Sequence, residues 1–277
     1  MSSEKFNLKG RHALITGGGG LLGIEHASAL LESNASVVIT DISESALSKA
    51  KKKLESHFDV DRIITYKMDV SDLKNIKAIA KKIEDLKIRI DILVNNAAID
   101  PKVIEADGII ETSRLENFPI QEWERQISVG LTGAFLASRV FGTLMAKDKK
   151  GGVILNIASD LSVISPDQRL YKKDGLEEKD QPVKPITYSV IKSGLIGLTL
   201  YLATYWADEN IRSNALSPGG VYNGQDEEFI TNLSSLIPLG RMANKDEYRS
   251  AIQFLCSDAS SYMNGQNIIM DGGRSIW

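Results

Sequence analysis

The sequence is poor in residues that form disulfides or bind metals. Its one cysteine, Cys256, rules out an internal disulfide and fits a reducing compartment. Because Cys256 lies in an apolar run, we expect a buried structural thiol. The three histidines, His12, His26 and His57, are far apart and lack the spacing of metal ligands. We interpret them as structural residues and predict no metal site.

The sequence also has neither a large excess of positive or negative residues nor a long hydrophobic segment. The formal net charge is −3 at pH 7, which gives no electrostatic basis for binding nucleic acid or an anionic membrane. No apolar run reaches the ~20 residues that span a bilayer, and residues 1–10 are too polar for a signal peptide. These absences predict a cytoplasmic protein that acts on a small molecule, with neither nucleic acid nor a membrane as partner.

Short apolar strands alternate with helices along the whole chain, without a linker or a shift in composition. This alternation predicts one α/β domain of the Rossmann type over residues 1–277, a doubly wound, seven-stranded parallel sheet with helices on both faces. We expect its ligands at the carboxyl ends of the strands. The expected strands span residues 11–16, 36–41, 62–68, 90–94, 153–157, 211–216 and 267–270. The helices with clear bounds span residues 24–33, 43–56, 120–147, 186–206 and 245–256.

A glycine-rich turn follows the first strand and leads directly into a helix. Its sequence is Gly17-Gly18-Gly19-Gly20-Leu21-Leu22-Gly23. Glycines allow close approach of the backbone to a pyrophosphate, and a helix N-terminus presents free N–H groups at the positive end of its dipole. The pattern therefore predicts a dinucleotide-binding turn. Its expected contact residues are Gly17, Gly19, Gly20, Leu21, Leu22 and Gly23.

A carboxylate ends the second strand. Asp41 lies about where an acid accepts hydrogen bonds from an adenosine ribose, and Ile42 beside it is a further expected cofactor contact. A carboxylate there repels a 2′-phosphate, and no arginine follows Asp41 to neutralise one. The sequence therefore favours NAD over NADP. The alternative role for Asp41 is to cap the helix at residues 43–56.

A tyrosine and a lysine four residues apart open the helix at residues 186–206. Such spacing places Tyr188 and Lys192 on one helix face. A free tyrosine titrates at about pH 10, and a fixed cation beside it favours the phenolate. Tyr188 could then exchange a proton with a substrate hydroxyl or carbonyl near neutral pH. The pair alone is a weak pattern, because it also occurs by chance on ordinary helices.

Several further motifs complete a familiar set, and together they resemble the short-chain dehydrogenase/reductase family over nearly the whole chain. Within the family, the sequence is most similar to single-domain oxidoreductases encoded with bacterial flagellin and surface-glycan pathways, which share the long segment between Ser159 and Tyr188. The motifs in the family's order and spacing are the glycine turn, Asn95-Asn96-Ala97, Ser159, the Tyr188/Lys192 pair, Pro218-Gly219 and Asp271-Gly272-Gly273.

The resemblance implies a role for each motif. Tyr188 would be the acid/base, Lys192 would lower its pKa and bind the nicotinamide ribose, and Ser159 would hold the reacting oxygen. Hydride would pass directly between the substrate carbon and the nicotinamide. The further cofactor contacts implied by the resemblance are Asp69, Val70, Asn95, Ala97, Pro218, Gly219 and Val221.

Three positions depart from the family pattern. Leu21 and Ala98 stand where the family usually has glycine. Gly130 stands where the family usually has an asparagine that opens the helix and helps to hold a proton-relaying water. Either water or a neighbour such as Ser128 or Thr132 replaces that side chain and turnover is slower, or the protein mainly binds its cofactor.

The sequence as a whole predicts an NAD-dependent oxidoreductase acting on a secondary alcohol or ketone, with an amino sugar or sugar phosphate of surface-glycan biosynthesis as candidate substrates. The alternative is a catalytically weak NAD-binding protein that assists a partner enzyme. We expect substrate loops at residues 99–119, 160–185 and 220–240, the last a movable lid. By analogy with the family, helices 120–147 and 186–206 are expected to assemble a homotetramer or homodimer.

Overall fold

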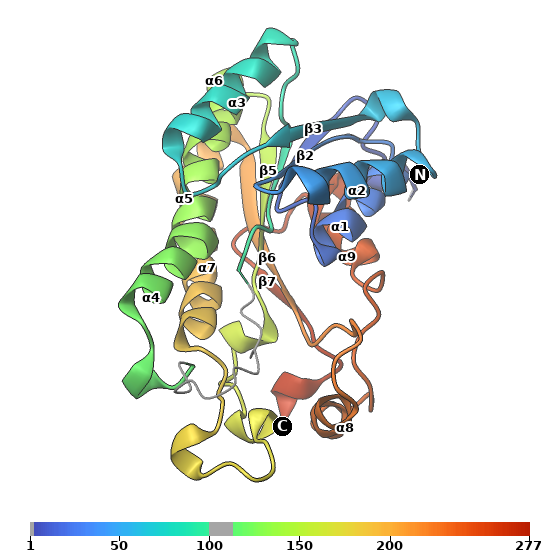
Figure 1. Ribbon diagram of the computed structural model, residues 1–277. Helices are drawn as coiled ribbons and strands as arrows, with labels where there is room; N and C mark the ends of the chain where they lie inside the picture. Colours follow the sequence, from blue (N-terminus) through green and yellow to red (C-terminus); the bar gives the residue numbers. More distant parts are fainter. Residues whose placement is uncertain (1–2, 100–112) are drawn as a thin grey trace.

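The computed structural model describes residues 3–99 and 113–277, so the expected loop at residues 99–119 lies largely outside the described residues. The chain forms the predicted seven-stranded parallel sheet, in the order β3-β2-β1-β4-β5-β6-β7 (Figure 1). The strand order reverses between β1 and β4, which opens a crevice at their carboxyl ends. The strands are β1 (His12–Thr16), β2 (Ser36–Asp41), β3 (Ile63–Lys67), β4 (Ile92–Asn95), β5 (Gly152–Ile157), β6 (Ile211–Pro218) and β7 (Asn267–Met270).

Helices cover both faces of the sheet, as predicted. One face carries α1 (Leu21–Glu32), α2 (Glu44–Glu55) and α9 (Arg249–Cys256). The other face carries α3 (Leu73–Asp85), a long helical stretch over residues 120–148, and α7 (Ile186–Tyr205). The long stretch is not uniform, because two π-helical turns interrupt it. Its parts are α4 (Ile120–Ile127), η4 (Ser128–Thr132), α5 (Gly133–Ala137), η5 (Ser138–Gly142) and α6 (Thr143–Asp148).

The central strands are buried on both sides, which explains their nearly continuous apolar sequences. In β1, Ala13 and Ile15 belong to the core beneath α1 and α9, whereas Leu14 belongs to the core beneath α3 and α7. Cys256 is fully buried at the end of α9, as expected, and burial raises the pKa of its thiol to about 12.

Two helices begin three or more residues from their predicted starts, and one expected loop contains a helix. The first helix begins at Leu21 rather than at residue 24, directly after an extended Gly20. The last helix begins at Arg249, because Glu247 accepts a hydrogen bond from the backbone N–H of Asn244 and holds residues 244–247 as a turn. The expected lid at residues 220–240 contains α8 (Glu227–Ser235), which Asp226 caps.

Two helical stretches are long and apolar enough to cross a membrane by length and composition, residues 120–148 and 186–205. The expectation that no segment reaches this length is therefore wrong. Both stretches lie against the sheet here, and buried core helices pass the same test. In α7, Lys192 and Thr199 are buried and hydrogen-bonded within the protein.

Candidate active site

The glycine turn brings the ends of β1 and β4 into close contact. Gly17 has a φ of +61°, and a Cβ atom there would lie 2.8 Å from the Cα of Ala97. Only glycine fits both this backbone conformation and this spacing. The side-chain amide of Asn96 donates to the carbonyls of Thr16 and Gly17, each at 3.0 Å. The turn after β1 and the turn after β4 are thus packed tightly together, and small residues line this wall of the crevice.

The N-terminus of α1 is suited to a phosphate group. Its N-cap residue, Gly20, has no side chain that could accept a hydrogen bond from the first-turn N–H groups. Those groups and the positive end of the helix dipole favour an anion. Leu21, the first residue of the helix, is 37% exposed. The turn therefore fits the pyrophosphate of a dinucleotide, although Leu21 replaces the usual glycine.

Asp41 lies beside this turn. Its carboxylate accepts hydrogen bonds from the backbone N–H groups of Gly19, at 3.1 Å, and Ser43, at 3.0 Å. The hydroxyl of Ser43, and not Asp41, caps α2 by accepting from the N–H of Ala46. The alternative role of Asp41 as helix cap is therefore wrong. Ile42 is 62% exposed, so its side chain is accessible to a ligand at this end of the sheet.

The structure directs some predicted cofactor contacts inward. Val70 is buried against Gly133, where an added Cβ would lie 2.7 Å from a methyl group of Val70. Asn95 is buried too, and its amide donates to Ser138 Oγ and Asn156 Oδ1, the second of which joins β4 to β5. Any contact of these two residues with a cofactor therefore falls to their backbone groups.

Asp69 instead retains a partly exposed loop position at the same end of the sheet. Its carboxylate accepts from both the backbone N–H and the hydroxyl of Ser71, at 2.8 and 2.6 Å. These bonds hold the start of the loop that precedes α3. The position fits the adenine contact that the family resemblance implies, but Asp69 already has local partners.

The three predicted catalytic residues gather at the carboxyl end of β5. Ser159 is the second residue after this strand, and α7 contacts the short 3₁₀ helix that begins after Ser159. Lys192 is 6% exposed and donates from Nζ to the carbonyl of Ile157 at 2.8 Å. The same Nζ lies 5.6 Å from the ring centroid of Tyr188. The helix thus places both side chains on one face, as the spacing predicted.

A second lysine, which the sequence analysis missed, also lies beside the tyrosine. Nζ of Lys184 is 4.0 Å from the ring centroid of Tyr188. The backbone N–H of Lys184 donates to Gln168, which holds this segment in place. Lys184 is four residues before Tyr188, but Pro185 lies between them and precedes the helix. Helical spacing therefore gave no reason to connect the two side chains.

Ser159 is hydrogen-bonded to a buried ion pair, which the sequence analysis also missed. Its hydroxyl donates to Asp160 Oδ1 at 2.8 Å, and Asp160 Oδ2 accepts from Arg274 at 2.8 Å. Arg274 belongs to η11 (Arg274–Ile276), close to the end of the chain. No local pattern in the sequence relates positions so far apart.

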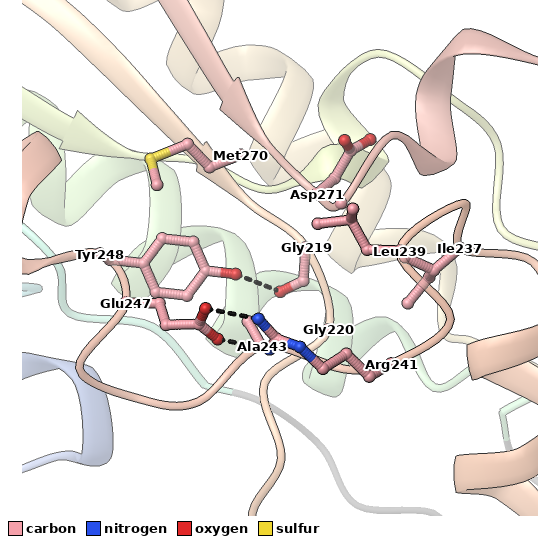
Figure 2. Close-up of a pocket in the computed structure, with 11 residues that line it drawn as sticks. Gly219, Gly220, Ile237, Leu239, Arg241, Ala243, Glu247, Tyr248, Met270 and Asp271 are labelled. Carbon is pink, nitrogen blue, oxygen red and sulfur yellow. Dashed lines mark hydrogen bonds and ion pairs between the residues drawn. The ribbon is translucent and has the colours of Figure 1, made fainter.

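The turn after β6, where the resemblance implies cofactor contacts, borders a cavity of about 190 Å³ (Figure 2). The N–H of Gly219 donates to Met270 at 2.9 Å, which fixes the turn to β7. Across the cavity, the buried hydroxyl of Tyr248 points at the carbonyl of Gly219, 3.5 Å away. Burial raises the pKa of Tyr248 far above its usual range, so its hydroxyl remains a neutral donor. Further along, Val221 pairs with Ala243 in an isolated bridge.

Fold and site together define a nicotinamide-dependent oxidoreductase: a dinucleotide crevice beside a serine, a tyrosine and a buried lysine. The family model described as "Enoyl-(Acyl carrier protein) reductase" matches residues 22–275. The chain belongs to the short-chain dehydrogenase/reductase family, as its motifs indicated, and is an oxidoreductase acting on CH–OH groups.

Known relatives align over almost their full lengths. The chain is 29% identical to an NAD-dependent glycerol dehydrogenase of Listeria innocua, covering 99% of this chain and 97% of that one. It is 31% identical to galactitol 2-dehydrogenase of Rhizobium johnstonii, covering 99% and 98%. Among solved structures, a gluconate 5-dehydrogenase from Burkholderia cenocepacia in complex with NADP and tartrate has a TM-score of 0.83 and 28% identity, covering 99% of both chains. These relatives include users of NAD and of NADP.

Proposed function

We propose that the protein is an NAD-dependent dehydrogenase that interconverts a secondary alcohol and a ketone on a polyol or a sugar acid. The observation that carries this proposal is the arrangement of Ser159, Tyr188 and Lys192 at the carboxyl end of β5. The relatives support the substrate class, since their names give glycerol, galactitol and gluconate as substrates. We therefore favour such substrates over an amino sugar or sugar phosphate of surface-glycan biosynthesis.

The residues of the site divide the chemistry between them. A bound nicotinamide supplies the hydride acceptor. Tyr188 takes the hydroxyl proton of the alcohol, and the ammonium groups of Lys192 and Lys184 stabilise the negative charge that this proton exchange requires on its oxygen. Ser159 donates a hydrogen bond to the substrate oxygen and fixes it in place.

Asp41 supports the choice of NAD. Its carboxylate is fixed by two backbone N–H groups at the end of β2, where an adenosine ribose would lie. A 2′-phosphate would meet this negative charge, and the residues that follow, Ile42 and Ser43, carry no positive charge. The hydroxyls of an NAD ribose would instead donate to the carboxylate.

The surface of α7 supports a homo-oligomer, with a tetramer or a dimer as the assembly. Leu200, Tyr201 and Tyr205 are each more than half exposed, and the two tyrosine rings stack at 5.5 Å between centroids. Phe135 on α5 is also exposed. Contact between copies of the chain would remove these apolar groups from water.

We also propose a cytoplasmic location. This part of the proposal rests on the composition of the sequence alone.

The test is the absorbance of NADH or NADPH at 340 nm, with glycerol, galactitol and gluconate for oxidation and the corresponding ketones for reduction. We expect turnover with NAD and a loss of about a hundredfold or more in Tyr188→Phe, which keeps the ring and removes the acid/base group. In Asp41→Ala, the preference for NAD over NADP should shrink. Equal turnover by wild type and Tyr188→Phe would contradict the proposal.

A second candidate function is a cofactor-binding protein with weak activity, and Gly130 favours it. An added Cβ at Gly130 would lie 2.8 Å from a methyl group of Ile191, so the space for the family's asparagine is already filled. Any proton relay there must use water or a neighbouring side chain. Tight binding of NAD, measured by calorimetry, without turnover of any tested alcohol would favour this function.

A further inference from the structure

The end of the chain reaches the catalytic centre through a buried ion pair. Arg274 donates from one guanidinium nitrogen to Asp160 Oδ2 at 2.8 Å. The two side chains are only 9% and 5% exposed. Asp160 directly follows Ser159 at the end of β5. The guanidinium of Arg274 therefore binds the residue next to Ser159, the serine that binds the substrate oxygen.

Both oxygens of the Asp160 carboxylate are occupied. Oδ1 accepts from the hydroxyl of Ser159 and from the backbone N–H of Leu161, each at 2.8 Å. Oδ2 accepts from Arg274. A carboxylate held by three donors on its two oxygens has little freedom to rotate. Its position, in turn, fixes the Ser159 oxygen that donates to it.

The position of Arg274 is fixed as well. The carboxylate of Asp271 accepts from the backbone N–H groups of Gly273 and Ser275, at 2.9 and 2.7 Å, on either side of Arg274. Trp277 donates from its indole to the carbonyl of Leu236, after α8, at 3.1 Å. The C-terminal turn is thus held to β7 and to the segment after α8, and it presents Arg274 to Asp160 from a defined place.

Stability alone gives no reason for this arrangement. Removing two charges from water costs free energy that a buried ion pair seldom recovers, and apolar residues of similar size often stabilise a protein better. An ion pair does provide direction, because charged hydrogen bonds are short and geometrically specific. Here the ion pair orients the Asp160 carboxylate, and that carboxylate holds the hydroxyl of Ser159.

We propose that Asp160 and Arg274 are positioning residues, which hold the Ser159 side chain in the rotamer that places its oxygen beside the substrate oxygen. The C-terminal turn is then part of the catalytic apparatus. This inference rests on the proposed function, since Ser159 binds a substrate oxygen only in an active enzyme. When the alcohol binds, only the hydroxyl hydrogen of Ser159 rotates from Asp160 to the substrate oxygen. The Ser159 oxygen stays in place, since it also accepts from the backbone N–H of Leu161 at 3.2 Å.

The test compares variants that break or preserve the chain of hydrogen bonds from Arg274 to Ser159. Arg274→Met keeps an unbranched apolar stem and removes the donors, and we expect kcat to fall by about tenfold to a hundredfold, with KM and NAD affinity within about twofold of wild type. Arg274→Lys keeps a charged donor and should retain most activity. The neutral pair Asp160→Asn with Arg274→Gln can rebuild the same chain between amides, and should be more active than Arg274→Met.

The matched control is Arg249→Met. Arg249 also donates to a buried carboxylate, Glu25, but this pair joins α9 to α1 and has no contact with Ser159. We expect the control to lower the melting temperature and to leave kcat unchanged. A folded Arg274→Met with the kcat of wild type would overturn the inference, as would an equal loss of kcat in Arg249→Met. If Arg274→Met does not fold, the double variant Asp160→Asn with Arg274→Gln replaces it in the test. A folded double variant whose kcat is as low as that of Ser159→Ala would overturn the inference.

Crystal structures with bound NAD separate this inference from the proposed function. In Arg274→Met, the Ser159 side chain should leave the rotamer that it has in wild type, while in Arg274→Lys it should keep that rotamer. An unchanged rotamer in Arg274→Met would overturn the inference without any assay. If wild type oxidises none of the tested alcohols, the proposed function fails, and these structures still decide whether Arg274 orients Ser159.

Discussion

The two halves of the crevice are built from different kinds of interaction. The cofactor half consists of the glycine turn at residues 17–23, Asp41 and residues 95–97. Apart from the Asp41 carboxylate, it relies on backbone groups and small side chains in close approach. The substrate half consists of Ser159, Tyr188 and Lys192, and it relies on charged side chains.

The difference reflects what each half must bind. A pyrophosphate needs N–H groups and little else, so a short local sequence can encode its site. Proton exchange at a substrate oxygen needs charges at fixed positions in a partly buried place. Here contacts from several elements hold those charges. The predictions below change one half at a time, from the largest expected effect to the smallest.

The largest effect is expected in the substrate half, at the two lysines beside Tyr188. Lys192→Met should lower kcat by about a hundredfold or more, because it removes a buried charge held by the carbonyl of Ile157. Lys184→Met should lower kcat by only about threefold to tenfold, since Lys184 is half-buried and acts through the ring face. Steady-state kinetics with NAD and galactitol would measure both. Equal losses would show that the two lysines act alike.

The next effect belongs to the cofactor half. Gly17→Ala places a methyl group against the backbone of Ala97 in a left-handed conformation, so we expect the Kd of NAD to rise by about tenfold or more. Gly175→Ala is the control, because Gly175 also has a positive φ, +82°, but has nothing within 4 Å of an added Cβ. Its Kd should match wild type. An unchanged Kd for Gly17→Ala, measured by calorimetry, would contradict the tight closure of the crevice.

A third change examines the helix contact behind the catalytic residues. An added Cβ at Gly130 would lie 2.8 and 3.1 Å from two carbons of the buried Ile191, so Gly130→Ala should lower the free energy of unfolding by about 1–3 kcal/mol. Gly197→Ala on α7, with nothing within 4 Å, should instead raise it by about 0.5–1 kcal/mol. Combining Gly130→Ala with Ile191→Ala should relieve the collision. Urea unfolding gives all three values, and a stabilised Gly130→Ala would mean that room for asparagine remains.

The smallest effect concerns His26, in the helix that follows the glycine turn. Burial lowers its pKa to about 4, and the nearby Glu25 carboxylate and Asn96 amide offset only part of this effect. The folded protein therefore keeps this ring neutral while the unfolded chain binds a proton at about pH 6.5. Because the unfolded state then holds more protons, stability falls as the pH decreases, by about 1 kcal/mol between pH 6.5 and 5.5.

The measurement for His26 is urea unfolding at several pH values, with His26→Leu as the comparison. The variant lacks the titrating ring, so this part of its pH dependence should disappear. The same slope in both proteins would show that other groups cause it.

The cofactor half could be predicted from the sequence because its parts are local. The glycine turn and Asp41 stand within one strand-helix-strand unit, and periodicity placed that unit correctly. Periodicity also placed Tyr188 and Lys192 on one face of α7. By contrast, the Asp160–Arg274 pair joins residues 114 positions apart, and only the folded sheet brings them together.

The direction of side chains, like long-range contacts, could not be predicted from the sequence. Val70 and Asn95 stand at the expected ends of their strands, yet their side chains are buried in the core, because each meets a helix on that face. Helix α8 was missed for a related reason. Its apolar residues, such as Leu233, cover a loop rather than the sheet, so their spacing gave only a short and irregular pattern.

The burial of Cys256 has a practical consequence for chemical labelling. Its thiol is inaccessible in the folded protein and stays protonated at neutral pH, so maleimides and oxidants should leave it intact. In effect, the native protein behaves as a cysteine-free scaffold. A single cysteine introduced on the exposed side of α8 would then carry a fluorophore alone, and would report directly whether this helix moves when the cofactor and the alcohol bind.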